Sequence, residues 1–357
     1  MVNTSLTKRI DWVDYAKGIC IILVVMMHST LGVEKAAGAQ SFVHYFIDWA
    51  RPFRMPDFFL ISGLFLASRI DRPWREYLDT KFIHFAYFYV LWMTIQLLSK
   101  AFGIYHEEGL HAVFSTYLWA FAEPFGTLWF IYMLAIFFVV TKLAQTVPPV
   151  LVFAAAALLE AAHVQTGFLV IDEFASRYVY FFAGFWMAAR VFKFADLVDT
   201  KSSPVILAGL VIWGFANYDL VHFGWAPMPG VSLPLGFIGA GAVITTGVLL
   251  SKFKLADALR YCGQNSIVIY LAFFLFMAGT RESLLRFMPR LDIGIVALLV
   301  TIVGVIGPLL LFWATRKTKF EFLFKRPGWA KLAKPVARWH SPNYVKQLHI
   351  KAHPEAR

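Results

Sequence analysis

Residues 11–28 read DWVDYAKGICIILVVMMH, and the interpretation of the whole chain starts here. Charged residues come first, an apolar run follows from Gly18 to Met27, and His28 closes the run. In an α-helix the spacing of Lys17 and His28 is about three turns, so the two side chains share one face about 16 Å apart along the axis. With Lys17 at a membrane surface, His28 would lie near the middle of the bilayer, where titratable groups usually have a function. The alternative is a core histidine that is satisfied by a hydrogen bond.

The composition indicates a membrane protein. Of the 357 residues, 59% are hydrophobic and 15% are charged, whereas soluble domains carry about 25% charged residues. Long apolar runs, without the short alternating segments of a transmembrane barrel, predict an all-α, polytopic helical bundle. About ten runs are candidate spans, at residues 18–35, 54–68, 82–103, 128–146, 149–165, 174–191, 204–220, 231–250, 263–280 and 293–315. Placing both termini in the cytoplasm puts most of the 33 Lys and Arg residues on the cytoplasmic side, as the positive-inside rule requires.

The net charge of +11 comes mainly from the end of the chain. We therefore divide the sequence into a membrane-embedded domain, residues 1–315, and a basic cytoplasmic tail, residues 316–357. Anionic lipid head groups explain such a tail better than nucleic acid does, so we expect membrane lipids as partners and no nucleic acid. Trp329, Leu332 and Trp339 stand among the basic residues, which favours a tail lying on the inner leaflet. A solvated, disordered end is the alternative.

Several familiar signatures are missing from the sequence. It contains no Gly-rich phosphate loop, no G-x-S-x-G elbow and no His-x4-Asp arrangement. Its two cysteines, Cys20 and Cys262, are too few for a disulfide framework or a cysteine zinc site. Lys17, the apolar run after it and the small residues at 37–39 resemble a cleavable signal peptide. Asp11 and Asp14 argue against cleavage, because they occupy what would be its positively charged region.

Polar residues also interrupt the second apolar region, residues 51–70, which reads RPFRMPDFFLISGLFLASRI. Arg54 and Asp57 are three residues apart and could pair on one helix face. Ser62 and Gly63 permit the close approach of another helix, such as that of His28. A packing interface with an interfacial ion pair would explain the same residues without a function.

A basic cluster follows this region, and its members are Arg69, Arg72, Arg75 and Lys81. Membrane topology alone explains such a cluster in most membrane proteins. Beside Lys17 the cluster could also bind the phosphates of an anionic cofactor.

The longest predicted outer loop, residues 104–126, has a composition suited to binding sugars. Among its aromatic residues it carries His106, Glu107, Glu108, His111, Trp119 and Glu123. A solvated loop and an interfacial amphipathic helix are the alternatives. His106 and His111 have poor ligand spacing for a helix, so we expect no metal site. Glu160, inside the fifth apolar run, is left out of the active site.

Four blocks of the sequence resemble the recognisable blocks of the acyltransferase-3 family. They are RIDWVDYAKGICIILVVMMH at 9–28, FRMPDFFLISGLFLA at 53–67, GTLWFIYMLAI at 126–136 and GQNSIVIYL at 263–271. The resemblance implies an integral membrane enzyme that transfers acyl groups, often acetyl or succinyl, to glycans and related acceptors. The family's Arg/Lys-x10-His motif falls on Lys17 and His28, which implies that these two residues are catalytic.

The chain departs from the family pattern in four respects. Lys17 stands where arginine is commoner, and Asp57 occupies a position that is usually apolar. Phe273 stands near the place where many members have a histidine. We expect no appended hydrolase-like domain of the kind that some members carry, and this departure leaves the acceptor the least defined part of the prediction.

The resemblance and the residues together predict a donor site and an acceptor site. Acyl-CoA would be a co-substrate, with no permanently bound cofactor, and its phosphates would bind Lys17, Arg69, Arg72, Arg75 and Lys81. Its thin arm would reach along the first helix to His28, which would act as a general base or as a covalent acyl relay. The substrate-binding residues would be Arg54, Asp57, Ser62 and Trp129.

The predicted function is O-acylation at a bacterial inner membrane, from acyl-CoA to a glycan or lipid-linked acceptor. A secondary transporter or exporter of an anionic solute is the alternative, since about ten spans with scattered intramembrane charges suit it too. A structural membrane component would leave the alignment of Lys17 and His28 unexplained.

Overall fold

The computed structural model describes residues 10–332 of the chain. The described residues are 80% helical and contain no strand. Seven of the described helical segments are long and apolar enough to cross a membrane, which confirms an all-helical membrane protein with several spans. They are Asp11–Ala37, Trp74–Glu108, Gly126–Thr146, Ser203–His222, Ser232–Phe253, Ser266–Phe287 and Ile293–Thr315.

The elements follow one another along the chain with short connections. In order they are α1 (Asp11–Ala37), α2 (Val43–Trp49), α3 (Arg51–Leu64), α4 (Trp74–Leu78), η1 (Asp79–Ile83), α5 (His84–Glu108), α6 (Leu110–Trp119), η2 (Gly126–Leu128), α7 (Trp129–Leu143), η3 (Ala144–Thr146), α8 (Pro149–Ala161), α9 (Leu169–Trp186), α10 (Ala188–Asp199), α11 (Ser203–His222), α12 (Ser232–Phe253), α13 (Asp257–Gln264), α14 (Ser266–Phe287), α15 (Ile293–Thr315), η4 (Lys319–Leu323) and η5 (Gly328–Ala330).

Three of the predicted spans fold as helices outside the group of seven. The run 54–68 becomes α3, with 14 residues, and the run 149–165 becomes α8, with 13 residues. Both are shorter than the roughly 20 residues that a bilayer core requires. Most of the run 174–191 becomes α9, whose first turns contain Asp172, Glu173 and Arg177. The total number of spans and the side on which each terminus lies therefore stay predictions.

The described chain forms two compact units, and each is considered by itself. The first unit contains residues 10–58 and 189–309, and the second contains residues 59–188 and 310–332. Both α3 and α15 begin in the first unit and end in the second.

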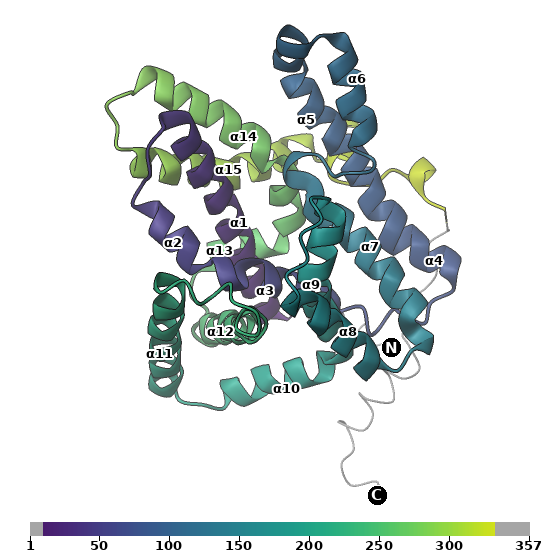
Figure 1. The fold of residues 1–357 in the computed structure, drawn as a ribbon, viewed down its shortest axis with the longest axis vertical. Helices are drawn as coiled ribbons and strands as arrows, with labels where there is room; N and C mark the ends of the chain where they lie inside the picture. Colours follow the sequence, from purple (N-terminus) through teal and green to yellow (C-terminus); the bar gives the residue numbers. More distant parts are fainter. Residues whose placement is uncertain (1–9, 333–357) are drawn as a thin grey trace, which may run out of the picture. The chain divides into compact units, whose positions relative to one another are not determined.

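The first unit is built around α1, which packs against α12, α13 and α14 (Figure 1). Glycines bring the backbones unusually close together. A Cβ atom at Gly263 of α13 would lie 1.7 Å from the carbonyl oxygen of Asp14. One at Gly18 of α1 would lie 2.2 Å from the carbonyl oxygen of Leu259. Any larger residue at these two positions would push α13 away from α1.

Both ends of α1 carry residues that stabilise the ends of a helix. Asp11 and Asp14 lie in the first turn and Lys35 lies in the last turn, and these charges suit the helix dipole. The helix ends at Gly38, whose left-handed backbone (φ 67°) lets its N–H reach the carbonyl oxygen of Glu34. Between these ends α1 is uninterrupted for 27 residues.

An aromatic cluster in the first unit fixes the start of α3. The indole of Trp49 donates a hydrogen bond to the carbonyl oxygen of Gly214 at 3.1 Å, and its ring meets those of Phe53 and Trp213. Asn217 of α11 donates a hydrogen bond to the carbonyl oxygen of Trp49 at 2.8 Å. The first turns of α3, which carry two predicted site residues, are therefore anchored to α11.

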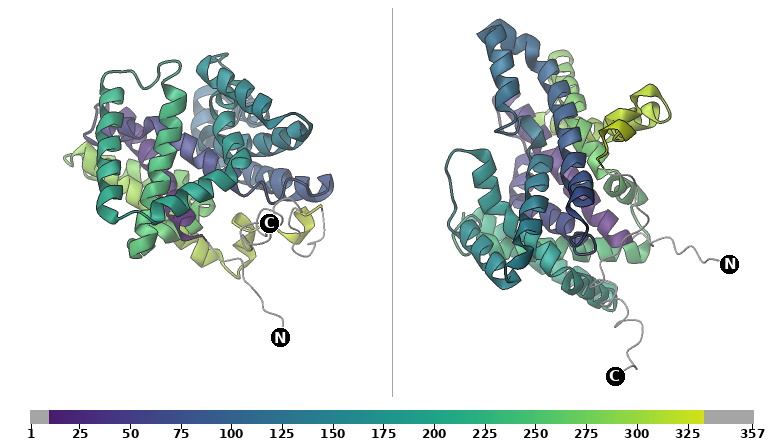
Figure 2. Two further views of the ribbon diagram at one scale, coloured as in Figure 1. Left: turned by 90° about the horizontal axis from the view of Figure 1, so that it is seen from below. Right: turned by 90° about the vertical axis from the view of Figure 1, so that its right-hand side faces the viewer.

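The second unit has an aromatic core on α7. The ring of Phe137 lies 5.1 Å from that of Phe59, 5.4 Å from that of Tyr178 and 5.5 Å from that of Phe181. The C-terminal elements η4 and η5 lie beside α4 and α5 (yellow in Figure 2). The predicted basic tail is described as far as Leu332, and Trp339 lies outside the described residues.

Candidate functional site

Lys17 and His28 lie on one face of α1, as predicted. Because α1 runs without a break from Asp11 to Ala37, the two side chains are about three turns and about 16 Å apart along the axis. Lys17 is half-buried, next to the glycine at which α13 approaches α1. The family motif is therefore presented by a single rigid helix.

The imidazole of His28 is half-buried and has unused hydrogen-bonding capacity. Its ring lies against that of Phe273 on α14, with the two centroids 5.5 Å apart. Among residues 10–332 no group is hydrogen-bonded to either ring nitrogen. This is not the arrangement of a core histidine that is satisfied by a hydrogen bond.

Asp57 has a partner that the sequence did not predict. Its Oδ2 accepts a hydrogen bond from the thiol of Cys20 on α1, and both residues are buried. Its Oδ1 is buried without a hydrogen-bond partner among the described residues. A carboxyl group in such surroundings has one oxygen left over for a proton or for a polar ligand. The pair ties α3 to α1 between Lys17 and His28.

The predicted pairing of Arg54 with Asp57 is wrong. Among the described residues Asp57 interacts through Cys20, whereas the Nη1 atom of Arg54 donates to the carbonyl oxygen of Ile47 at 3.4 Å. The two residues are three apart on α3, but tertiary packing turns the carboxyl group toward α1. Arg54 is buried all the same.

In the second unit, Lys142 on α7 fixes the loop between α3 and α4. Its buried ammonium group donates hydrogen bonds to the carbonyl oxygens of Ile70 and Arg72, at 2.5 and 2.8 Å. The rings of Trp74 and Tyr77 lie 5.2 and 4.9 Å from the same nitrogen. The loop that carries Arg69 and Arg72, two of the predicted phosphate-binding residues, is therefore held through its backbone.

The four basic residues of this region differ in their surroundings. Arg69 and Arg75 are exposed, whereas Arg72 and Lys81 are half-buried. The ammonium group of Lys81 lies 4.2 Å from the centre of the Phe138 ring. Loss of hydration at the guanidinium, although the residue as a whole is exposed, and then the like charge of Arg72 lower the pKa of Arg69 below its ordinary value. A bound anion would relieve the repulsion between these two like charges.

The close helix approach predicted at Ser62 and Gly63 is present, but α9 is the partner. A Cβ atom at Gly63 would lie 2.2 Å from the carbonyl oxygen of Phe181. One at Gly184 of α9 would lie 2.0 Å from the carbonyl oxygen of Leu60. Gly63 therefore permits a close contact with α9, and not with the helix of His28 as the sequence suggested.

Trp129 begins α7 and is half-buried. Its ring lies 6.1 Å from that of Phe59 and 6.4 Å from that of Phe130. Its indole N–H makes no hydrogen bond among the described residues. An aromatic face with an unused donor is suited to a sugar, and the predicted substrate-binding role stays a prediction.

A model of the family described as an acyltransferase domain matches residues 10–315. The chain belongs to the acyltransferase-3 family. The matched range includes the Lys17–His28 motif and extends to the last residue of α15.

A curated relative supports a membrane location for this family member. The chain is 28% identical over 287 residues to the inner membrane protein YcfT of Escherichia coli strain K12. The alignment covers 72% of this chain and 77% of the relative. No solved structure matches the chain.

One departure from the family pattern lies directly at the site. Phe273, near whose position many members have a histidine, is fully buried and provides the ring against which His28 packs. A phenyl ring cannot exchange a proton with the imidazole. In this family member the neighbour therefore shapes the surroundings of His28 without taking part in acid–base chemistry.

The predicted sugar-binding segment forms helices. It comprises the end of α5 and then α6, in which no residue is buried. The indole of Trp119 donates a hydrogen bond to Glu123 at 3.0 Å. The segment is therefore not an irregular solvated loop, and its role in binding an acceptor stays a prediction.

Two contributors to these sites were missed in the sequence. Cys20 was considered only for disulfides and zinc, although a thiol within an apolar helix is also a donor for a buried carboxylate. Lys142 was counted only as a topological charge. The signal for Lys142 was available, since it is a single cation inside a long apolar run.

Proposed function

We propose that this acyltransferase-3 family protein transfers an acyl group, of acetyl or succinyl type, from acyl-CoA to a hydroxyl group of a glycan or glycolipid. The observation that carries the proposal is the imidazole of His28. It is half-buried, it has no hydrogen-bond partner among residues 10–332, and it shares a face of α1 with Lys17. A neutral imidazole of this kind can accept a proton or attack a carbonyl group.

The proposed binding of the acyl donor rests on a set of basic residues and on the distance between Lys17 and His28. Lys17 and the basic residues Arg69, Arg72, Arg75 and Lys81 are proposed to bind the phosphates of the CoA moiety. The separation of about 16 Å between Lys17 and His28 suits a thin arm that ends in a thioester. No permanently bound cofactor is needed for this reaction.

In the proposed reaction His28 acts as a general base. The acceptor hydroxyl oxygen attacks the thioester carbonyl carbon while its proton passes to an imidazole nitrogen. The carbon–sulfur bond breaks, and the departing thiolate takes the proton from the imidazolium to give free CoA. In the covalent variant the imidazole nitrogen attacks the thioester first and the acyl group then passes to the hydroxyl.

The acceptor is proposed to meet Arg54, Asp57, Ser62 and Trp129. The free Oδ1 of Asp57 and the unused indole N–H of Trp129 are groups that a sugar can hydrogen-bond to. We also propose a bacterial inner membrane as the location, with both termini in the cytoplasm, where acyl-CoA is available.

The experiment uses the full chain in lipid nanodiscs with acetyl-CoA and succinyl-CoA, each radiolabelled in the acyl group. Free CoA and labelled glycolipid are measured in the presence of a membrane glycolipid extract. The proposal expects the thioester to be consumed and the label to reach the acceptor. If proteoliposomes instead carry a labelled anionic solute across the bilayer and consume no thioester, the protein is a transporter and the proposal fails.

The two routes are separated by rapid quenching at neutral pH in the cold during the first turnover, because an acyl-imidazole hydrolyses quickly in acid. A label that stays on the protein at His28 selects the covalent route. A label that passes to the acceptor without remaining on the protein selects the general-base route.

A further inference from the structure

The described part of the basic tail is firmly attached to the second unit. Its anchor is a buried ion pair in which Arg326 donates to Oδ2 of Asp79 at 2.8 Å and to the carbonyl oxygen of Asp79 at 2.7 Å. The other oxygen, Oδ1, accepts a hydrogen bond from the backbone N–H of Leu332 at 2.7 Å. The two charged side chains are only 7% and 6% exposed. Such a pair holds a segment in one position.

Three side chains of α4 and α5 reinforce the anchor by binding tail carbonyl groups. The indole of Trp92 donates to the carbonyl oxygen of Leu323 at 2.9 Å, and the hydroxyl of Tyr87 donates to that of Phe322 at 3.1 Å. The Nε atom of Arg75 donates to the carbonyl oxygen of Leu332 at 3.2 Å. Residues up to Leu332 are therefore a docked segment and not the solvated end that was the alternative.

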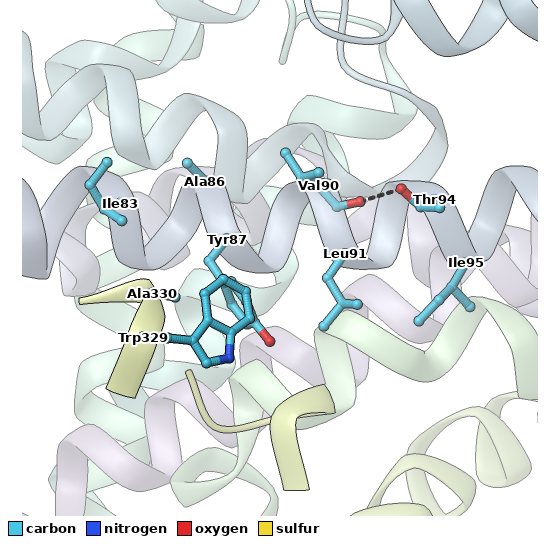
Figure 3. Close-up of a pocket in the computed structure, with 9 residues that line it drawn as sticks. All are labelled: Ile83, Ala86, Tyr87, Val90, Leu91, Thr94, Ile95, Trp329 and Ala330. Atoms are coloured by element: carbon cyan, nitrogen blue, oxygen red, sulfur yellow. Dashed lines mark hydrogen bonds between the residues drawn. The ribbon is translucent and has the colours of Figure 1, made fainter. Parts of the chain in front are cut away.

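Docking of this segment creates a groove along α5, shown in Figure 3. The groove has a volume of about 530 Å³ and is open along one side. Its walls are Ile83 at the end of η1, then Ala86, Tyr87, Val90, Leu91, Thr94 and Ile95 of α5, together with Trp329 and Ala330. The indole of Trp329 lies beside the ring of Tyr87 at one end of the row (Figure 3).

The two hydroxyl groups that line the groove are already hydrogen-bonded within the protein. The hydroxyl of Thr94 donates to the carbonyl oxygen of Val90 at 2.8 Å, as Figure 3 shows. The hydroxyl of Tyr87 is bonded to the docked segment. Since the groove lies on the candidate span Trp74–Glu108, its apolar wall is suited to a hydrocarbon chain.

One exposed cation, Lys331, adjoins the Trp329 end of the groove. Lys331 is exposed and directly follows the lining residue Ala330. The exposed cations elsewhere on the docked segment are Arg316, Lys317, Lys319 and Lys325, of which Lys325 pairs with Glu321 at 3.0 Å. Trp329 itself is 83% exposed, which is usual for an indole at a membrane interface. An anion with an apolar chain matches both parts of this surface.

We propose that the groove binds an anionic phospholipid. One acyl chain would lie along Ile83–Ile95 beneath the indole of Trp329, and the phosphate would meet Lys331. A cation beside an apolar groove, here Lys331, distinguishes such a site from the ordinary lipid-facing surface of a helix, which has no preference for head-group charge. The proposal is independent of the reaction proposed above.

The test is native mass spectrometry of the full chain, exchanged from detergent into mixtures of phosphatidylglycerol and phosphatidylcholine. We expect the unmodified chain to retain one phosphatidylglycerol in preference to phosphatidylcholine. Lys331→Gln should weaken retention about fivefold, as the loss of one cation near an anionic head group implies. Trp329→Ala should weaken both lipids, because it removes one wall of the groove.

Lys193→Gln and Trp225→Ala are the matched controls, since both residues are exposed and lie in the first unit. They should retain the lipid as the unmodified chain does. Equal retention of the two lipids by the unmodified chain would overturn the proposal, and so would Lys331→Gln and Trp329→Ala behaving like the controls. Displacement of phosphatidylglycerol by equimolar acyl-CoA or lipid-linked sugar would assign the groove to a substrate and would also overturn it.

Discussion

His28 on α1 and Lys142 on α7 both interrupt long apolar helices, but their surroundings differ completely. Lys142 is 7% exposed, and its ammonium group is occupied by two carbonyl oxygens and two aromatic rings. His28 is half-buried, and its ring nitrogens have no hydrogen-bond partner among the described residues. A polar group whose bonding capacity is used up holds structure, whereas one that keeps its capacity can react.

The largest effect should come from His28→Ala. Because a positioned base contributes about 10²- to 10⁴-fold to a proton-transfer step, we expect kcat for acyl transfer to fall by that factor. The thermal unfolding temperature should stay within a few degrees, because the imidazole makes no hydrogen bond among the described residues and the substitution removes only its ring contact with Phe273. Transfer of labelled acetyl groups and unfolding in detergent measure the two quantities. His222→Ala, an exposed histidine of α11, is the control and should leave both unchanged.

Lys142→Met should show the opposite pattern. The substitution leaves the carbonyl groups of Ile70 and Arg72 without their donor, and such losses cost about 1–3 kcal/mol of unfolding free energy. The basic loop should also loosen, so KM for acyl-CoA should rise more than kcat falls. Lys193→Met, on the surface, should change neither the unfolding free energy nor the KM for acyl-CoA. An unfolding free energy that is unchanged in Lys142→Met would show that the buried amine is not a structural clamp.

Gly263→Ala tests whether the contact of α1 with α13 positions Lys17. The new Cβ atom would lie 1.7 Å from the carbonyl oxygen of Asp14, and forcing such a clash typically costs about 1–3 kcal/mol. We expect a lower unfolding temperature together with a higher KM for acyl-CoA. Gly103→Ala is the matched control, since a Cβ atom there meets nothing within 4 Å. Equal stability of both variants would mean that α13 moves aside without consequence.

The smallest effect should come from the exposed cation of the basic loop. Arg69→Gln removes one charge from a proposed phosphate site, and KM for acyl-CoA should rise about fivefold, as for one partly screened charge-assisted contact. The rise should shrink at high salt, because exposed charges are screened. Initial rates at two ionic strengths measure this. A change in kcat at an unchanged KM would place Arg69 outside donor binding.

The sequence predicted those features that depend on neighbours along the chain. The alignment of Lys17 with His28 follows from helical periodicity. The small residues Ser62 and Gly63 predicted a close contact with another helix. The identity of the contacting helix, α9, could not be read in this way, because packing partners depend on the tertiary structure. The same reason explains the failed pairing of Arg54 with Asp57.

Sequence patterns could not predict hydrogen-bond and ion-pair partners that are far apart in the chain. Cys20 and Asp57 are 37 residues apart, and Asp79 and Arg326 are 247 residues apart. Nothing in either local sequence identifies the other member of the pair. The C-terminal segment was therefore predicted from its composition alone, as a basic tail near lipid, while its docking on α5 became visible only in the structure.

The most direct test of the account is the reactivity of His28 itself, measured by diethylpyrocarbonate labelling of the full chain and peptide mass spectrometry. The account predicts that His28 is modified in the folded protein, that transfer activity falls in step with its modification, and that acyl-CoA slows both. Full modification of His28 with undiminished transfer, or a His28 that stays unreactive until the protein unfolds, would contradict it.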